Sequence, residues 1–440
     1  MSENAYSSKK VLNKAIFNIG FQIVPIAAAL ILTPYLIETM GKDSWAKYSI
    51  GISLIFLSNY FSFGIGPTLN RRVSEIIGLK ENYRIKEELK ECVSFSYLLG
   101  TVFFVVLQLV LYAAYSSESF SILQSIGDYT FFFNVLCVFF LAFIIIPYRS
   151  LLESFSDFYF LAIIRAFTAA MLFVIPFMYS YFSEISLKGI AMILFVFYVL
   201  LCFLYFFRIK SYQKKFSFQV YGPLEWNVVK RMFKFEMGFL KETIWFSIFF
   251  LTSALVLFFD RFYYPMFFDT KIISDQVTML DLFNRVAIIT GTISLVYFSA
   301  ISVWYQEKNI SRIKTSLRLQ LIGVGGFFTF ILIFSYLFLD VVLKWWLQAS
   351  FSAFIYENAY RLLIGVLMTN YTILLIRPLQ AIGKIKTVSI WLLGSTVIYL
   401  VIVLFLGEYR AIAYHYLAFV VKALLDMIFL VTLLRRNRIL

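Results

Sequence analysis

Long apolar segments recur along the whole chain, and they restrict its fold more than any other feature. A helix needs about 20 apolar residues to cross the hydrocarbon core of a membrane. Segments of that length lie near 15–37, 45–67, 93–115, 129–148, 158–180, 188–208, 243–263, 277–303, 319–339, 360–378, 387–406 and 412–434. The sequence therefore predicts an all-α integral membrane protein with about twelve transmembrane helices.

The composition supports this prediction and excludes a soluble enzyme. Of 440 residues, 61% are hydrophobic and only 15% are charged, whereas a typical soluble domain has about 25% charged residues. A net charge of +14 could suggest nucleic-acid binding, but the Lys and Arg residues lie in short runs between the apolar spans. Membrane topology explains such runs better, so we expect no nucleic-acid partner.

The distribution of basic residues predicts the orientation. With the N-terminus inside, the inner segments collect most of the Lys and Arg residues, including Arg71, Arg72 and the tail residues Arg435 and Arg436. The positive-inside rule then places both termini in the cytoplasm. The first span is too long for a signal-peptide core and no small-residue cleavage pattern follows it, so we expect it to be retained.

The longest hydrophilic stretch, 209–242, divides the chain into two halves. It contains Gly222-Pro223, a helix-breaking pair. We predict an N-terminal six-helix lobe over 1–208, a cytoplasmic linker over 209–242, and a C-terminal six-helix lobe with a short basic tail over 243–440. Because six is even, both halves enter the membrane in the same orientation. That permits a parallel repeat with a binding site between the halves.

Sequence signatures of catalysis are missing. We find no Walker loop, zinc signature, nucleophile elbow or dinucleotide fingerprint, and the three scattered cysteines include no CxxC pair. We therefore expect no enzyme activity, no cofactor and no metal. The single histidine, His415, lies near the outer end of the last span, and we interpret it as an interfacial side chain and not as a proton relay.

Charged residues at membrane depth are the most informative candidates, because such groups usually face a bundle interior or a water-filled cavity. The cations Arg165, Arg285 and Lys422 are candidates for substrate binding, and the acids Asp260, Asp281 and Asp426 are candidates for ion coupling or charge balance. Together they predict a cationic excess within the membrane. An anionic cargo such as a diphosphate would match that field.

Each of these charges also has a simpler interpretation. Lys422 and Asp426 are separated by four residues, as are Asp281 and Arg285, so each pair could neutralise itself and fix helix packing. Arg165 has no partner of this kind in its own helix. Three further arginines lie close enough to an interface to snorkel, and for them we favour that interpretation: Arg261, Arg361 and Arg377.

The first span combines polar residues with prolines. Asn18 and Gln22 lie on one face of the predicted helix, and Pro25 and Pro34 follow. Proline removes a backbone donor, so we expect a bent helix, and its polar face is a candidate substrate-binding surface or a packing surface. Asn59 in the second span is a weaker candidate of the same kind.

The N-terminal third resembles bacterial O-antigen flippases of the polysaccharide transporter family, within the multidrug/oligosaccharidyl-lipid/polysaccharide exporter superfamily. The resemblance rests on NKAIFNIGFQIVPIAAALILTPYLIETMGKDSWAKYSIG and FSFGIGPTLNRRVSEIIG. The matching features are Pro34-Tyr35-Leu36-Ile37, Met40-Gly41, Tyr48, Gly64-Ile65-Gly66 before Arg71-Arg72, and Asp260-Arg261 in the seventh span. The chain departs from the family at Ala46, where glycine is common.

The resemblance implies two six-helix lobes around a cationic lumen in a multi-pass protein of the bacterial inner membrane. It also implies translocation of undecaprenyl-diphosphate-linked O-antigen repeat units for lipopolysaccharide biosynthesis. Transport would proceed by alternating access as an antiporter coupled to H⁺ or Na⁺. Other O-antigen assembly membrane proteins would be candidate partners.

Three alternatives remain open at this point. An O-antigen polymerase is an enzyme of similar size and hydrophobicity, but it is expected to have a large periplasmic loop, and the outer loops here are short. A multidrug exporter would be expected to use unpaired acidic residues, of which this sequence offers few. A lipid II flippase carries a cargo with the same diphosphate anchor.

Overall fold

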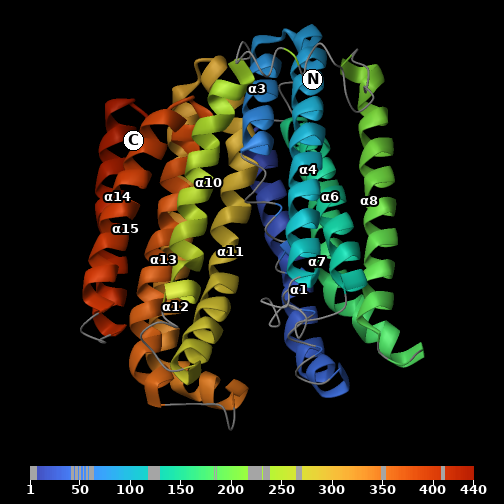
Figure 1. Cartoon of the computed structure of the whole chain (residues 1–440). Helices are drawn as coiled ribbons and strands as arrows, with labels where there is room; N and C mark the ends of the chain where they lie inside the picture. The colour runs from blue at the N-terminus through green and yellow to red at the C-terminus, as the bar shows by residue number, and fades with distance from the viewer. Residues whose placement is uncertain are drawn as a thin grey trace. The chain divides into compact units, whose positions relative to one another are not determined.

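The computed structural model is helical throughout its described residues, which are 7–40, 44, 48, 51, 52, 54, 55, 58, 64–116, 129–182, 184, 186–216, 230, 238–263, 270–347, 353–407 and 412–440. Figure 1 shows the helices. They are α1 Ser8–Met40, α3 Ile65–Leu79, a short 3-10 helix η2 Asn82–Arg84, α4 Ile85–Ser116, α6 Tyr129–Ser154, α7 Phe158–Phe182, α8 Leu187–Phe216, α10 Gly238–Tyr263, α11 Thr270–Gln306, α12 Ile310–Leu347, α13 Ala353–Ala381, α14 Ile385–Gly407 and α15 Ile412–Arg436.

The predicted all-α membrane class is confirmed. Within the described part of the chain, nine helices are long and apolar enough to cross a membrane, namely α1, α4, α6, α7, α8, α12, α13, α14 and α15. Two further predicted spans, 243–263 and 277–303, coincide with α10 and α11. The second predicted span, 45–67, lies largely outside the described residues. α1 continues through Pro25 as one uninterrupted helix.

The chain forms two compact units. The first unit comprises Ile16–Ser247, and the second comprises Met1–Ala15 with Ile248–Leu440. The division therefore falls inside two helices, near the start of α1 and within α10. Most of the predicted linker lies outside the described residues, so its bounds stay a prediction. The described parts show that α8 continues to Phe216 and that α10 begins at Gly238.

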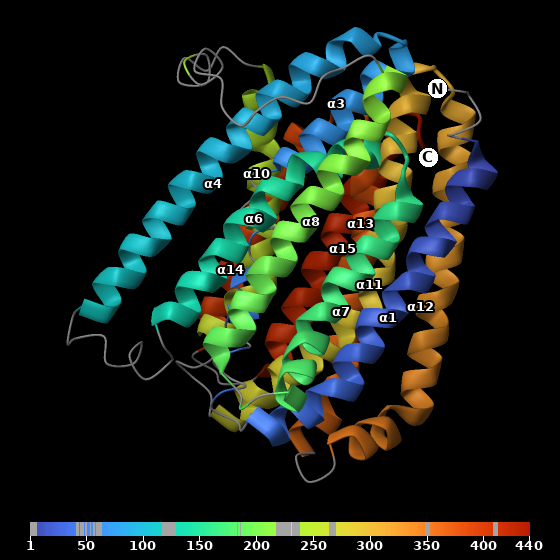
Figure 2. The same ribbon diagram turned by 90° about the vertical axis from the view of Figure 1, so that its right-hand side faces the viewer.

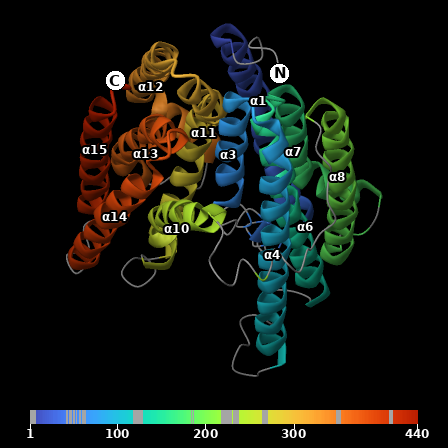
Figure 3. The same ribbon diagram turned by 90° about the horizontal axis from the view of Figure 1, so that it is seen from above.

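The two units repeat one pattern of helix pairs. In the first unit α6 is central and packs against α3, α4, α7 and α8, while α3 also packs on α4 and α7 on α8. Figure 2 shows α6 between α4 and α8. In the second unit α13 is central and packs against α11, α12, α14 and α15, while α11 packs on α12 and α14 on α15 (Figure 3). The same pairs recur in the same chain order, as a parallel repeat would give.

The turns between helices repeat as well. Each of four helices ends with a left-handed residue, namely Lys80, Ser156, Lys308 and Gly383. In each case this residue and the next donate backbone hydrogen bonds back to the last helical turn. This arrangement satisfies the carbonyls at a helix end and reverses the chain within three residues. Gly383, which precedes Lys384, thus serves as a helix cap.

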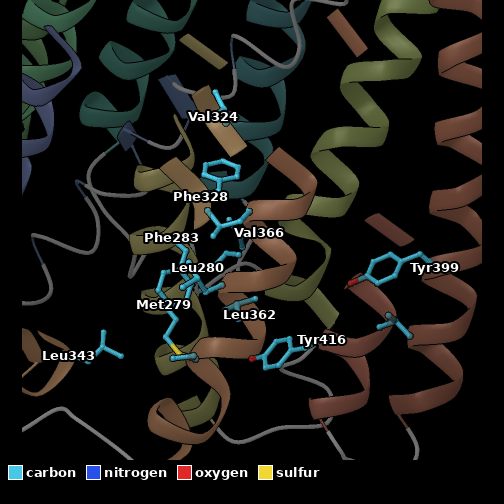
Figure 4. Close-up of a cluster of buried hydrophobic side chains, with 14 of the residues drawn as sticks. Met279, Leu280, Phe283, Val324, Phe328, Leu343, Leu362, Val366, Tyr399 and Tyr416 are labelled. Atoms are coloured by element: carbon cyan, nitrogen blue, oxygen red, sulfur yellow. The ribbon is translucent and has the colours of Figure 1, made fainter. Parts of the chain in front are cut away.

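Aromatic and aliphatic side chains fill the core of each unit. In the second unit all five helices from α11 to α15 contribute to one cluster, whose buried members include Met279, Phe328, Val366, Tyr399 and Tyr416 (Figure 4). In the first unit α6 is buried on nearly all sides, from Phe131 to Ser154. A helix buried in this way is held by its neighbours on every face, so charged residues on it are placed with little freedom.

Candidate functional site

A cluster of polar and charged side chains lies inside the first unit, where α3, α6 and α7 meet. We call it the Glu153 cluster, and it consists of Asn70, Arg149, Glu153 and Arg165. The carboxylate of Glu153 is the centre: Arg165 makes an ion pair with its Oε1 atom, and Arg149 Nε lies 3.8 Å from the same oxygen. The other oxygen, Oε2, accepts a hydrogen bond of 3.0 Å from Asn70 Nδ2.

Helix geometry places these groups together. Arg149 and Glu153 are four residues apart on α6, so they share one face of that helix. The tight turn after Ser154 leads into α7, and the long side chain of Arg165, two turns into α7, reaches back to the carboxylate of Glu153. Asn70 of α3 is held in turn, because Ser74 donates a hydrogen bond of 3.2 Å to its side-chain oxygen.

Tyrosines of α8 complete the electrostatic environment of this cluster. Tyr205 interacts with Arg149, Glu153 and Arg165, and Tyr198 interacts with Arg149. Both phenols are buried. The side chain of Glu153 is only 6% exposed, while those of Arg149 and Arg165 are 30% and 19% exposed. The carboxylate is therefore the most deeply buried charged group of the cluster, and the two arginine side chains are partly buried around it.

This arrangement gives Arg165 an ion-pair partner that the sequence did not indicate. Its own helix offers no i,i+4 partner, but Glu153 of α6 supplies a carboxylate. Sequence reasoning missed Glu153 because the predicted fourth span ended at residue 148, before both Arg149 and Glu153. The i,i+4 spacing of these two residues was a readable signal. Its pairing with Arg165 depends on tertiary structure.

In the second unit the pair Lys422 and Asp426 is formed within α15. Lys422 Nζ lies 2.7 Å from Asp426 Oδ2, and Trp391 of α14 donates a hydrogen bond of 2.9 Å to Asp426 Oδ1. The ring of Trp391 stacks on Phe429 at 4.1 Å between centroids. Both charges are largely enclosed, so the pair neutralises itself and ties α14 to α15. This agrees with the simpler of the two sequence interpretations.

The polar residues of α1 differ in their placement. Asn18 is fully buried, and among the described residues its amide nitrogen and oxygen have no hydrogen-bond partner. Gln22, one turn later, is half-buried. The neighbouring Phe17 packs edge-on against Tyr159 of α7, with ring centroids 4.8 Å apart. Asn18 therefore faces a packed environment, which leaves its predicted role in substrate binding a prediction.

Four of the predicted site residues cannot be placed. Asn59 lies outside the described residues, and the side chains of Asp260, Asp281 and Arg285 lie outside the described side chains. Their roles therefore stay predictions.

The remaining sequence candidates are placed by the structure. Arg361 is exposed, and its position near a membrane interface stays a prediction. Arg377 is half-buried, donates a hydrogen bond of 3.1 Å to Gln380 and lies 6.0 Å from the ring of Phe298. His415 is 1% exposed and thus buried among the helices, and its position at a membrane interface stays a prediction.

A second ionic network connects α3, α4 and the first turns of α10. Glu242 of α10 pairs with both Arg71 and Arg72 of α3, and Arg72 also contacts both carboxylate oxygens of Glu88 at 3.0 Å. Burial alone would lower the pKa values of both arginines. The carboxylates outweigh that effect, so both pKa values lie above the ordinary range of arginine.

The glycines of the motif Gly64-Ile65-Gly66 have a packing role. Gly64 starts α3 in a left-handed conformation, with φ 69°, and an added Cβ would overlap the Cβ atom of Phe246 in α10. A Cβ on Gly66 would lie 2.8 Å from the hydroxyl of Ser150 in α6. These glycines therefore allow α3 to approach α10 and α6 closely.

The buried carboxylates share one property. Among the described side chains three acids are almost wholly buried, and each makes an ion pair: Glu153 with Arg165, Asp157 with Arg208, and Asp426 with Lys422. No group of three or more potential metal ligands occurs in the described part of the chain. The described interior thus offers neither an uncompensated carboxylate nor a metal cluster.

The fold defined by these helices is that of the MATE-like transporters of the MOP superfamily, with two lobes. The chain is similar to a multidrug resistance MATE family transporter of that superfamily solved in an outward-facing conformation, with a TM-score of 0.74, 13% identity and coverage of 98% of this chain and 96% of the other. No protein-family model and no curated protein sequence matches the chain.

Two further solved structures have the same fold. One is a MOP superfamily transporter from Pyrococcus furiosus, for which a binding pocket of reverse polarity suggests a different function. Its TM-score is 0.75 at 13% identity, over 98% of this chain and 96% of the other. The other is the Vibrio cholerae MATE transporter VcmN in the bent form, with a TM-score of 0.71 at 13% identity over 99% of each chain. At such identity the likeness shows the fold alone.

Proposed function

We propose that this chain is a membrane transporter that moves an anionic, lipid-linked oligosaccharide across the bacterial inner membrane by alternating access of its two lobes. The cargo is an O-antigen repeat unit on undecaprenyl diphosphate. The fold supports the transporter class, because the solved proteins that share it are described as transporters. The resemblance of the N-terminal third to O-antigen flippases supports the cargo.

The proposal that the cargo is anionic rests on the pairing of the buried carboxylates among the described side chains. An exporter of cationic drugs needs acidic side chains that are available to its cargo. Here the buried acids Glu153, Asp157 and Asp426 are each neutralised by a cation of the chain. In the Glu153 cluster two arginines face one carboxylate, and the arginines are the more exposed groups. Guanidinium groups bind phosphates through paired, charge-assisted hydrogen bonds.

The short connections between helices argue against a polymerase. Apart from 41–64, which contains most of the second predicted span, the longest connection between described helices on the predicted outer side is 117–128, and the others are shorter: 183–186, 264–269, 348–352 and 408–411. None of these segments is long enough for a large periplasmic loop with catalytic arginines. The polarity described for the Pyrococcus furiosus protein suggests that pocket charge separates functions within this fold, and the same criterion applied here favours an anionic cargo.

Leaflet-specific labelling tests this proposal. The lipid-linked repeat unit would be labelled from the periplasmic side in cells that lack the protein and in cells complemented with it. We expect labelled units to be lost in the deletion strain and restored by the gene, and a normal rate without the protein would refute the proposal. The surface glycan adds a second readout: a polymerase defect leaves single repeat units there, whereas a flippase defect leaves none. Loss of viability would instead indicate lipid II as the cargo.

A further inference from the structure

We propose that the exposed side of α12 binds an anionic phospholipid of the inner leaflet, with the phosphate of its head group on Lys314 and Arg318. The basis is an internal repeat. Both units keep two cations at the equivalent place, and the second unit lacks the acids that accompany them in the first. The site depends on the membrane environment and not on which cargo the protein moves.

The turns that precede α4 and α12 set the register of this repeat. Lys80 and Lys308 both adopt a left-handed backbone conformation after the preceding helix. A shift of 228 residues, the difference between 308 and 80, relates the two turns. The same shift pairs residues that are buried in both helices: Ile85 with Ile313, and Leu89 with Leu317. The first turns of α4 and α12 are therefore equivalent positions of one repeat.

The equivalent segments differ in their acids and not in their cations. Lys314 and Arg318 of α12 correspond to two lysines of α4, Lys86 and Lys90. The three acids of this part of α4 correspond to uncharged residues of α12: Glu87 to Thr315, Glu88 to Ser316 and Glu91 to Leu319. Two cations and three acids give this segment of α4 a charge of −1, whereas two cations alone give the segment of α12 a charge of +2.

The turn before α12 shows the same change. Ahead of α4, Glu81 forms an ion pair of 2.7 Å with Arg84. The equivalent Asn309 caps α12 instead, because its side-chain oxygen accepts a hydrogen bond of 3.2 Å from the backbone N–H of Arg312. The side chain of Arg312 is exposed, and no acid among the described residues pairs with it. This turn therefore keeps the cation and loses its neutralising acid.

The other turn at this end of the unit changes in the same direction. In the first unit Asp157, at the turn between α6 and α7, pairs with Arg208 of α8 at 2.7 Å. The turn between α13 and α14 carries Lys384 at the equivalent place, and the last turn of α15 carries Arg435 and Arg436. All three side chains are exposed. This end of the second unit is thus more cationic than its counterpart in the first.

Membrane topology does not account for the missing acids. The positive-inside rule counts Lys and Arg residues, and acidic residues contribute little to it. α4 and α12 carry two cations each at equivalent positions, so both satisfy the rule equally. The loss of the acids has a different consequence, because it leaves a surface that attracts anions. Anionic phospholipids supply such groups at the cytoplasmic leaflet.

An exposed row of residues continues from the two cations along one side of α12, which is a single long helix (Figure 2). Its members are three or four residues apart, as on one side of a helix. All of them are exposed, and we call the row the α12 face: Lys314, Arg318, Ile322, Gly326, Thr329, Ile333 and Tyr336. A Cβ added to Gly326 would meet nothing within 4 Å, so the surface there is open.

The dimensions of the α12 face match one phospholipid. Half of the hydrocarbon core measures about 15 Å, which a helix spans in about ten residues. With its phosphate at Arg318, an acyl chain would therefore follow Ile322 and Gly326 toward the middle of the membrane. The guanidinium of Arg318 can form paired hydrogen bonds with phosphate oxygens, and Lys314, one turn away, adds a second positive charge.

Native mass spectrometry of the purified full-length protein tests the proposal. The protein would be titrated with phosphatidylglycerol or with phosphatidylcholine of the same acyl chains, so that the net charge of the head group is what differs. We expect the wild type to retain phosphatidylglycerol at least fivefold more strongly. Lys314→Gln combined with Arg318→Gln should lower this preference at least threefold and leave the retention of phosphatidylcholine unchanged.

Two further variants separate this site from a general effect of charge. Lys86→Gln combined with Lys90→Gln removes the equivalent cations of α4 and is the matched control. Because three acids accompany those cations, this variant should keep the wild-type preference within twofold. Thr315→Glu restores an acid on the exposed side of α12, three residues from Arg318. It should lower the preference at least twofold although every cation is still present.

Several results would overturn the proposal. They are equal retention of the two lipids by the wild type, an equal loss of preference in the α4 and α12 double variants, and an unchanged preference in Thr315→Glu. Displacement of the bound lipid by soluble glycerol phosphate would also overturn it, because the acyl chain would then contribute nothing. None of the changed side chains is buried, and Thr315→Glu tests the site without removing a cation.

Discussion

Gly64 provides the sharpest test of how the first unit is assembled. Replacing it with alanine introduces two costs. Its φ of 69° places it in the left-handed region, which costs a residue with a Cβ atom about 1–2 kcal/mol. The new Cβ would also overlap the Cβ atom of Phe246, with the Phe246 Cα and carbonyl carbon at 3.1 and 3.0 Å. These atoms belong to the backbone region of α10 and cannot rotate away.

Overpacking of this kind typically costs about 1–3 kcal/mol. The two contributions together predict that Gly64→Ala lowers the free energy of unfolding by about 2–5 kcal/mol. The assay is thermal unfolding of the purified protein in detergent, followed by tryptophan fluorescence. For a unit of this size we expect the melting temperature to fall by at least about 4 °C.

Gly20→Ala is the matched control, because it lies within α1 and an added Cβ there would meet nothing within 4 Å. Alanine favours a helix over glycine by roughly 0.8–1 kcal/mol, so this variant should melt at or slightly above the wild-type temperature. If Gly64→Ala also melted within about 1 °C of the wild type, the close approach of α3 and α10 would be wrong.

Three further predictions concern charges and thiols. Arg72→Lys should cost about 1–3 kcal/mol, because one ammonium group cannot bridge two carboxylates as the guanidinium does. Since the pKa of Arg72 is raised, its ion pairs contribute below the unfolded pKa and are lost only above the folded one. Chemical unfolding of the wild type should therefore reveal no loss of this contribution between pH 7 and 10, and a loss would contradict the network. Removing one member of the pair Lys422 and Asp426 should cost about 3–5 kcal/mol in thermal melting, and the double change to glutamine and asparagine should cost less than the sum. Additive costs would show that the pair does not form. In the native protein Cys137, which is partly exposed, should react with a thiol reagent before the buried Cys92 does. Mass spectrometry of the labelled peptides measures the order of reaction. The reverse order would show that the described burial of Cys92 in α4 is wrong.

Hydropathy predicted the presence of the membrane helices but not their ends. The predicted spans 188–208 and 319–339 lie within α8 and α12, which the structure extends to Phe216 and back to Ile310. These extensions are polar and basic, so a search for apolar residues stops before the backbone hydrogen bonding does. The same effect concealed the Glu153 cluster, because Arg149 and Glu153 ended the apolar run of the fourth span.

Local spacing predicted local contacts and could not predict those between helices. The four-residue spacing of Lys422 and Asp426 correctly indicated their ion pair, whereas the hydrogen bond from Trp391 depends on how α14 packs against α15. Likewise, the motif Gly64-Ile65-Gly66 was recognisable as sequence. Its physical reason, the approach of Phe246 and Ser150, exists only in the folded unit.

Three properties of the molecule belong together. Apolar length gives membrane helices, two central helices organise two similar units, and each buried carboxylate among the described side chains pairs with a cation of the chain. The proposal of an anionic cargo rests on this last property, because paired acids leave less negative charge in the described interior for a cation to bind.

Transport by the purified protein in proteoliposomes tests that central claim most directly. Movement of a polyprenyl-diphosphate-linked oligosaccharide and movement of a cationic dye such as ethidium would be measured side by side, with Arg165→Gln as the variant. We expect the wild type to move the anionic lipid-linked glycan and not the dye, and Arg165→Gln to slow the glycan at least tenfold. Movement of the dye without movement of the glycan would contradict this expectation.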